Sequence, residues 1–81
     1  APDFVVEILS ASTESRDRGP KLKLYARHGV RELWLVDPRE KRVEIHELIA
    51  AELRCVETLE GTATAASRVL SGFSIPLERI F

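Results

Sequence analysis

The sequence predicts one small α/β domain in which a strand, a helix and a β-hairpin are followed by further antiparallel strands. Two continuous apolar runs, at residues 3–9 and 32–37, are typical of strands buried on both faces. Residues 20–28 fit a short helix, and residues 42–48 alternate as a half-exposed strand does. We therefore expect residues 1–81 to form a single domain, built as the edge of an α/β sandwich rather than as a doubly wound sheet.

The first strand leads into the helix through residues with clear local roles. The small hydroxyl residues at 10–13 are of the kind that cap a helix start. Pro20 is well tolerated at a first helical position. Either a short turn precedes a helix that starts at Pro20, or one longer helix is kinked there. Gly29 is a natural C-terminal stop.

The second half of the chain predicts a hairpin and two further extended segments. Residues 37–41 contain Asp-Pro and form a turn, after which Val43 and Ile45 share one face of the strand at 42–48. A further strand is expected from 53 to 59, ending at a Glu-Gly turn. Residues 71–77 are predicted to be extended, and residues 77–81 to close as a short helical turn.

The composition of the chain argues against several classes of protein. Lys and Arg total 12 against 13 Asp and Glu, so there is no basic excess of the kind that holds proteins on nucleic acid through phosphate contacts. A single cysteine excludes an intramolecular disulfide framework and fits a reducing, cytoplasmic location. No apolar run approaches the roughly 20 residues of a membrane span. Because the chain begins Ala-Pro-Asp without an initiator Met, we expect a fragment or a processed piece.

A basic stripe is possible locally despite the balanced charge. Its alternative interpretation is a solvated helix face. The stripe would comprise Arg16, Arg18, Lys21, Lys23, Arg27 and Arg31.

Apart from Asp3 at its first position, Glu7 is the only charged residue in the run at 3–9, which otherwise has the pattern of a buried strand. A buried carboxylate needs a partner such as a metal ion or a cation. Its alternative is a place at the sheet edge, with the side chain reaching solvent. Asp3 lies four strand residues away, roughly 13 Å, which is too far for two carboxylates to share one cation.

The helix offers a lysine to this strand. At roughly 100° per residue, Asp17, Lys21 and Tyr25 lie along one side of a helix that is continuous back to 17. Lys21 stands at the border of the apolar face, whereas Lys23 and Arg27 fall on the solvent side. An ordinary Asp17–Lys21 helix pair is the alternative.

Other sets of residues predict no site. His28 and His46 have no spacing with Cys55 that suggests zinc, so both histidines are expected at the surface. Trp34 and Tyr25 are interpreted as core residues rather than as platforms for stacking bases.

A series of spaced features runs through almost the whole chain. It comprises Pro2-Asp3-Phe4-Val5-Val6-Glu7-Ile8-Leu9-Ser10, Ser12-Thr13, Asp17, Lys21, Tyr25, Gly29-Val30, Glu32-Leu33-Trp34-Leu35-Val36-Asp37-Pro38 and Gly72-Phe73-Ser74-Ile75-Pro76-Leu77. This series resembles the Uma-type restriction-endonuclease family, a branch of the PD-(D/E)XK nuclease superfamily. The resemblance implies a restriction endonuclease-like core fragment, corresponding to the C-terminal part of the nuclease domain.

The resemblance also implies a function and a site. It assigns Glu7 as a metal-ligand carboxylate, the carbonyl of Ile8 as a further ligand of Mg²⁺, and Lys21 as the catalytic lysine, in an endonuclease that hydrolyses DNA. Ser10, Asp17 and Tyr25 would support that site. In the superfamily the lysine normally follows the carboxylate by two positions, where this chain has Leu9, and resemblance to the Uma-type branch places the lysine on the next helix. The family's first catalytic Asp is expected upstream of Ala1.

Two non-catalytic alternatives share the same fold. One is a dimerising module with a vestigial carboxylate site, since the exposed faces of a truncated sheet favour self-association into a homodimer. The other is a protein that binds nucleic acid without cleaving it, against which the neutral charge argues.

Overall fold

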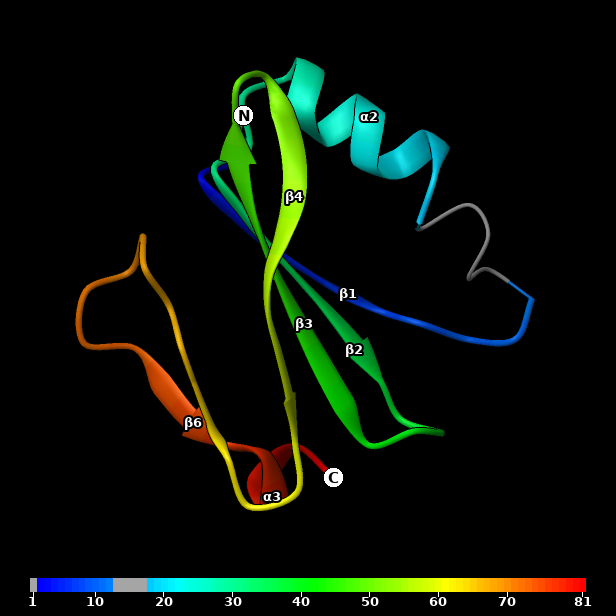
Figure 1. Ribbon diagram of the computed structural model, residues 1–81, viewed down its shortest axis with the longest axis vertical. Coiled ribbons are helices and arrows are strands. Elements are labelled where there is room, and N and C mark those ends of the chain that lie inside the picture. Colours follow the sequence, from blue (N-terminus) through cyan, green and yellow to red (C-terminus); the bar gives the residue numbers. More distant parts are fainter. Residues whose placement is uncertain (1, 13–17) are drawn as a thin grey trace.

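The computed structural model describes residues 2–12 and 18–81, and it contains the strands and helices that the sequence predicts (Figure 1). The elements are β1 (Phe4–Ile8), α2 (Pro20–Arg27), β2 (Glu32–Asp37), β3 (Arg42–Ile49), β4 (Glu52–Glu60), β5 (Thr64–Ala66), β6 (Ser74–Pro76) and α3 (Leu77–Ile80). Neither of these helices has the length and apolar content that a membrane crossing requires.

The central sheet has the strand order β1-β2-β3-β4. The first two strands are parallel, because α2 carries the chain back across the sheet between them. The remaining neighbours are antiparallel and follow one another through tight turns. This mixture of one crossover and two hairpins confirms the predicted α/β class and the strand–helix–hairpin order.

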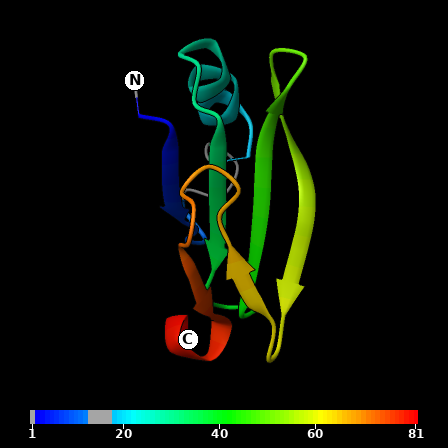
Figure 2. The same cartoon turned by 90° about the vertical axis from the view of Figure 1, so that its left-hand side faces the viewer.

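The sheet separates two apolar clusters. On one face, Leu33 and Leu35 of β2 pack with Leu9 beneath α2, whose Leu22 contributes from the helix. On the other face, the side chains of β2 and β3 pack against the small β5–β6 sheet and α3. That second cluster comprises Trp34, Val36, Val43, Ile45, Ala65 and Leu77. Figure 2 shows β5 and β6 on the near side of the sheet and α2 on the far side.

α2 starts and stops where local chemistry dictates. Pro20 occupies the first helical position after a turn at Gly19, so the described helix starts at Pro20. At the other end Gly29 adopts φ +81°, a left-handed conformation that glycine enters without a Cβ penalty. Val30 N–H then donates to the carbonyl of Tyr25 at 3.0 Å, which closes the helix end.

β4 contains a bulge. Ile45 pairs with Glu57 but the next residue of β3, His46, pairs with Cys55, so Val56 is an extra residue in the ladder. The bulge switches the side-chain alternation of β4. Leu53 therefore packs beneath α2, whereas Leu59 packs against the opposite cluster.

Two burial expectations from the sequence are wrong. β1 is not covered on both faces, since Val6 is 46% and Ile8 is 66% exposed. β1 is an edge strand in the described sheet, and little covers its second face. Conversely, the polar face of β3 is covered: His46 is 6% exposed rather than at the surface.

Glu32 ties the two layers together and is completely buried. Its carboxylate accepts hydrogen bonds from the Trp34 indole at 3.0 Å and from the Ser67 hydroxyl at 2.6 Å. The backbone N–H groups of Arg68 and Val69 donate to it at 3.1 Å each. Burial alone would raise the pKa of Glu32, but the hydrogen bonds from Ser67, Trp34 and the two backbone groups together lower it. The carboxylate is thus held ionised inside the protein.

Candidate functional site

Glu7, Lys21 and Tyr25 meet beneath α2. The Glu7 side chain leaves β1 on the face that α2 covers and is 19% exposed. Lys21 Nζ lies 3.3 Å from Glu7 Oε2, and the Tyr25 hydroxyl donates to Glu7 Oε1. Both carboxylate oxygens are therefore held by groups from one helix.

The local sequence explains this meeting. Lys21 and Tyr25 are four residues apart, so they lie one helical turn above the other on the same side of α2. Leu22, one position on, turns toward the apolar cluster and anchors the helix on the sheet. Glu7 points to the same face as Leu35, its partner on β2, and that face is the one that the crossover helix covers.

The backbone adds an oxygen at the edge of the sheet. Leu9 N–H donates to the carbonyl of Val36 at 2.8 Å, so it points toward β2. No described peptide bond is cis, and a trans peptide directs the Ile8 carbonyl the opposite way. Because β2 is the only neighbour of β1 among the described strands, the Ile8 oxygen faces the outer edge of β1.

The donor set at this edge suits a hard cation. A carboxylate and a backbone carbonyl are oxygen ligands that Mg²⁺ accepts, and the ion commonly keeps several waters beside one or two protein carboxylates. Glu7 oxygens present about four lone-pair positions, and the Lys21 and Tyr25 bonds named above use two of them. The residues present thus fit such an ion, which the Glu7 carboxylate and the Ile8 carbonyl would hold.

The other predicted residues lie around this trio. Ser10 is exposed just beyond β1, where its hydroxyl is 3.2 Å from that of Ser12. Asp17 lies outside the described residues. The carbonyl of Asp3 accepts hydrogen bonds from the N–H groups of Arg31 and Glu32, at 3.1 Å each, so Asp3 marks the entry to β1.

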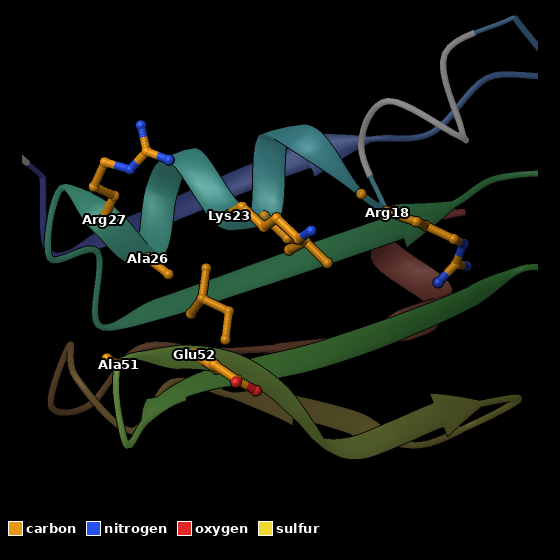
Figure 3. Close-up of a pocket in the computed structure, with 9 residues that line it drawn as sticks. Arg18, Lys23, Ala26, Arg27, Ala51 and Glu52 are labelled. Atoms are coloured by element: carbon orange, nitrogen blue, oxygen red, sulfur yellow. The ribbon is translucent and has the colours of Figure 1, made fainter.

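A groove of about 630 Å³ lies on the other side of α2, between the helix and the start of β4. Its floor is apolar and includes Leu22 and Leu53. Figure 3 shows Lys23 and Arg27 on the helix and Glu52 across from them on β4. The exposed Lys23 confirms that this lysine points away from Glu7.

A second polar cluster occupies the same face of the sheet on β3 and β4. A carboxylate oxygen of Glu44, a ring nitrogen of His46 and the sulfur of Cys55 all lie within 4.8 Å of one another. Arg18 donates to Glu44 Oε1 at 2.8 Å, and this hydrogen bond is the main reason that the pKa of Glu44 is lowered.

Sequence spacing could not reveal this second cluster. The spacing of His46 and Cys55 in the sequence suggested no zinc site, yet the structure places both Glu44 and Cys55 beside His46. Glu44 and His46 lie two positions apart on one strand and therefore point to the same face, which the sequence alone indicates. Cys55 lies opposite His46 on β4, next to the bulge, and this pairing depends on a strand register that sequence spacing does not reveal.

Comparison with known proteins identifies the family of the chain. A search of the curated proteins found no match. The family model Uma2, described as "Putative restriction endonuclease", matches residues 1–78 of the 81. That match covers every described strand of both sheets and supports a nuclease-like function. The chain therefore belongs to the Uma2 family, with a fold compatible with part of a restriction endonuclease-like domain.

Proposed function

We propose that this protein takes part in metal-dependent hydrolysis of DNA phosphodiester bonds, with Glu7 as a metal-ligand carboxylate and Lys21 as the catalytic lysine. The observation that carries the proposal is the 3.3 Å contact between Lys21 Nζ and Glu7 Oε2, which joins a strand residue and a helix residue fourteen positions apart. Membership of the Uma2 family supplies the nuclease class. The contact supplies the two residue types that such a centre needs on one side of the scissile phosphate.

Each residue of the trio has a distinct task. Glu7 provides the negative oxygens, and the Ile8 carbonyl adds a neutral one at the same edge of β1. Tyr25 donates to Glu7 Oε1 and thereby restricts the rotation of the carboxylate. Lys21, whose side chain is 36% exposed, can orient a water or stabilise negative charge that develops on the phosphate.

A divalent ion such as Mg²⁺ would lower the pKa of a bound water and polarise a phosphoryl oxygen. The protein's own part is to hold Glu7 and Ile8 in place and to bring Lys21 alongside. Lys21 neutralises Glu7 across a short distance, which keeps the carboxylate compatible with its partly buried position beneath α2.

Plasmid nicking tests the proposal. The complete gene product should nick supercoiled DNA in the presence of Mg²⁺ and not in the presence of a chelator. Glu7→Gln and Lys21→Met should each lower the rate by at least about a hundredfold, because each removes a charge at the reacting phosphate. Full activity in either variant would remove that residue from the mechanism.

Lys23→Met is the matched control. Lys23 lies on the same helix two residues from Lys21 and points into the groove on the other side. The same loss of charge there should leave the nicking rate unchanged. If Lys23→Met and Lys21→Met lose equal activity, net helix charge rather than a site at Glu7 is responsible.

One observation favours self-association as a second candidate function. β1 has no outer neighbour among the described strands, and its Val6 and Ile8 side chains are 46% and 66% exposed. Such an edge can pair with a second copy. Light scattering on the purified chain should then show a dimer that Ile8→Lys disrupts; a monomer at all concentrations would exclude this candidate.

A further inference from the structure

We infer that Glu44, His46 and Cys55 form a second metal site, selective for a soft or borderline cation such as Zn²⁺ and separate from the edge of β1. The three side chains come from β3 and β4 and share the face of the sheet that α2 covers. The proposal does not depend on nuclease activity. It assigns to this chain a metal chemistry different from that of Glu7.

The ligand atoms are already gathered. The Glu44 oxygen, the His46 nitrogen and the Cys55 sulfur lie within 4.8 Å of one another. Zinc bonds of about 2.0 to 2.3 Å place tetrahedral ligands about 3.3 to 3.8 Å apart. The three atoms therefore need to close by about 1 Å, which side-chain rotation on two adjacent strands can supply.

His46 carries the independent sign of a ligand. Its side chain is 7% exposed, and its Nδ1 is buried without a hydrogen-bond partner among the described residues. The other ring nitrogen, Nε2, lies 3.2 Å from Glu44 Oε1. A buried imidazole with one unsatisfied nitrogen is costly for a structural residue. A cation bound at Nδ1 would give that nitrogen the partner that it lacks, beside a carboxylate and a thiol that can share the ion.

The donor set selects the metal. A thiolate and an imidazole favour Zn²⁺ over Mg²⁺, whose preferred ligands are oxygen atoms. On binding, the Cys55 thiol loses its proton to solvent, a metal–sulfur bond forms and a water leaves the ion. Thr58 Oγ1 lies 3.6 Å from the sulfur and can donate to the thiolate. Cys55 is exposed, so a fourth position remains open to water.

Arg18 has two opposite effects on this site: it stabilises the ionised Glu44 ligand, and its positive charge repels the cation. Its Nη1 lies 2.8 Å from Glu44 Oε1, the same oxygen that His46 approaches. The guanidinium keeps Glu44 ionised, as a ligand must be, but adds a positive charge beside the cation. A carboxylate and a thiolate together balance a divalent ion, so Arg18 leaves the occupied site with one positive charge.

Cobalt absorption tests the site in the full chain. Because Cys55 is the only cysteine, a thiolate-to-cobalt charge-transfer band reports its coordination directly. Co²⁺ should produce the band, Zn²⁺ should abolish it by displacement, and a large excess of Mg²⁺ should leave it in place. Cys55→Ser should eliminate the band. Glu44→Gln and His46→Gln should each weaken Co²⁺ binding by at least about tenfold.

Matched controls separate this site from its neighbours. Glu57→Gln changes a carboxylate two residues from Cys55 but on the opposite face, and it should bind Co²⁺ as the unmodified chain does. Glu7→Gln should also bind normally if the two metal sites are independent. The proposal is overturned if no band forms at millimolar Co²⁺, or if Glu44→Gln and His46→Gln both bind with unchanged affinity, which would show binding by the lone thiol.

Thermal unfolding covers the case in which His46→Gln does not fold. Zn²⁺ should raise the melting temperature of the unmodified chain, because it binds the folded state. Cys55→Ser alters an exposed side chain and should fold normally without that rise. An equal rise in Cys55→Ser would refute the site.

Discussion

Replacing Glu32 by Gln is the sharpest test of how the two layers are joined. The substitution keeps the size of the side chain but converts one carboxylate oxygen into an N–H₂ group. Oε2 accepts from the Trp34 indole, and Oε1 accepts from Ser67 and Val69. Whichever oxygen is lost, at least one buried donor then faces another donor.

The cost follows from these contacts. One buried donor without an acceptor costs about 1 to 3 kcal/mol, and the surviving hydrogen bonds lose their charge assistance. Burying a neutral amide instead of a charge offsets part of this. We expect a net loss of about 2 to 3 kcal/mol from a chain whose whole stability is about 4 to 12 kcal/mol. The melting temperature should fall by about 10 to 20 °C.

Urea unfolding followed by tryptophan emission measures this loss, since Trp34 is the only tryptophan and donates to Glu32. Glu52→Gln is the control, because its side chain is 70% exposed in a surface pair with Arg54. That control should change the free energy of unfolding by less than about 0.5 kcal/mol. If Glu32→Gln is equally harmless, the hydrogen bonds at Glu32 do not hold the layers together.

The pH dependence gives an independent check. The pKa of Glu32 is lowered on folding, so its contribution is fully present above its ordinary pKa and is lost as the pH falls through the folded value. The stability difference between the unmodified chain and Glu32→Gln should be constant near neutral pH. It should shrink in acid, below the ordinary value of 4.5. A difference that stays constant into strong acid would contradict the assignment of an ionised Glu32.

Three further outcomes are expected. Tyr25→Phe removes the hydroxyl that donates to Glu7 and should slow DNA nicking by about tenfold with the fold intact, as judged by circular dichroism; an unchanged rate would deny Tyr25 a positioning role. Gly29→Ala forces φ +81° on a residue with a Cβ, and the melting temperature should drop by about 4 to 8 °C although nothing crowds the new methyl group. Arg18→Ala should raise the pKa of Glu44 toward its ordinary value in an NMR titration, since the Arg18 hydrogen bond is the main cause of the lowering; no change would place that cause elsewhere.

Much of the fold could be predicted from the sequence because its signals are local. Pro20 and Gly29 bound the helix through their own backbone preferences. The apolar run at 32–37 forms β2, and all six of its residues are buried. What the sequence could not show is which neighbours a strand acquires, so the exposure of Val6 and Ile8 on β1 and the burial of His46 on β3 were wrongly predicted.

The candidate site likewise contains residues that local patterns indicated and depends on contacts that they could not indicate. Glu7 was conspicuous as a charge in an apolar strand, and helix periodicity directed Lys21 and Tyr25 toward it; the structure brings all three together. Their catalytic roles stay predictions. Glu32 escaped notice because all of its partners except Trp34 lie thirty-five or more positions away, in a loop whose course no local pattern predicts.

The bulge at Val56 determines where β4 can lose a residue without disturbing the sheet. Removing one residue elsewhere in β4 would shift its neighbours onto the wrong face of the sheet. Val56 is the exception: without it the pairs Ile45–Glu57 and His46–Cys55 become consecutive rungs of a regular ladder. Its deletion should therefore leave Cys55 opposite His46 and both apolar clusters intact. Among relatives, natural single-residue gaps in this strand should accordingly gather at this one position.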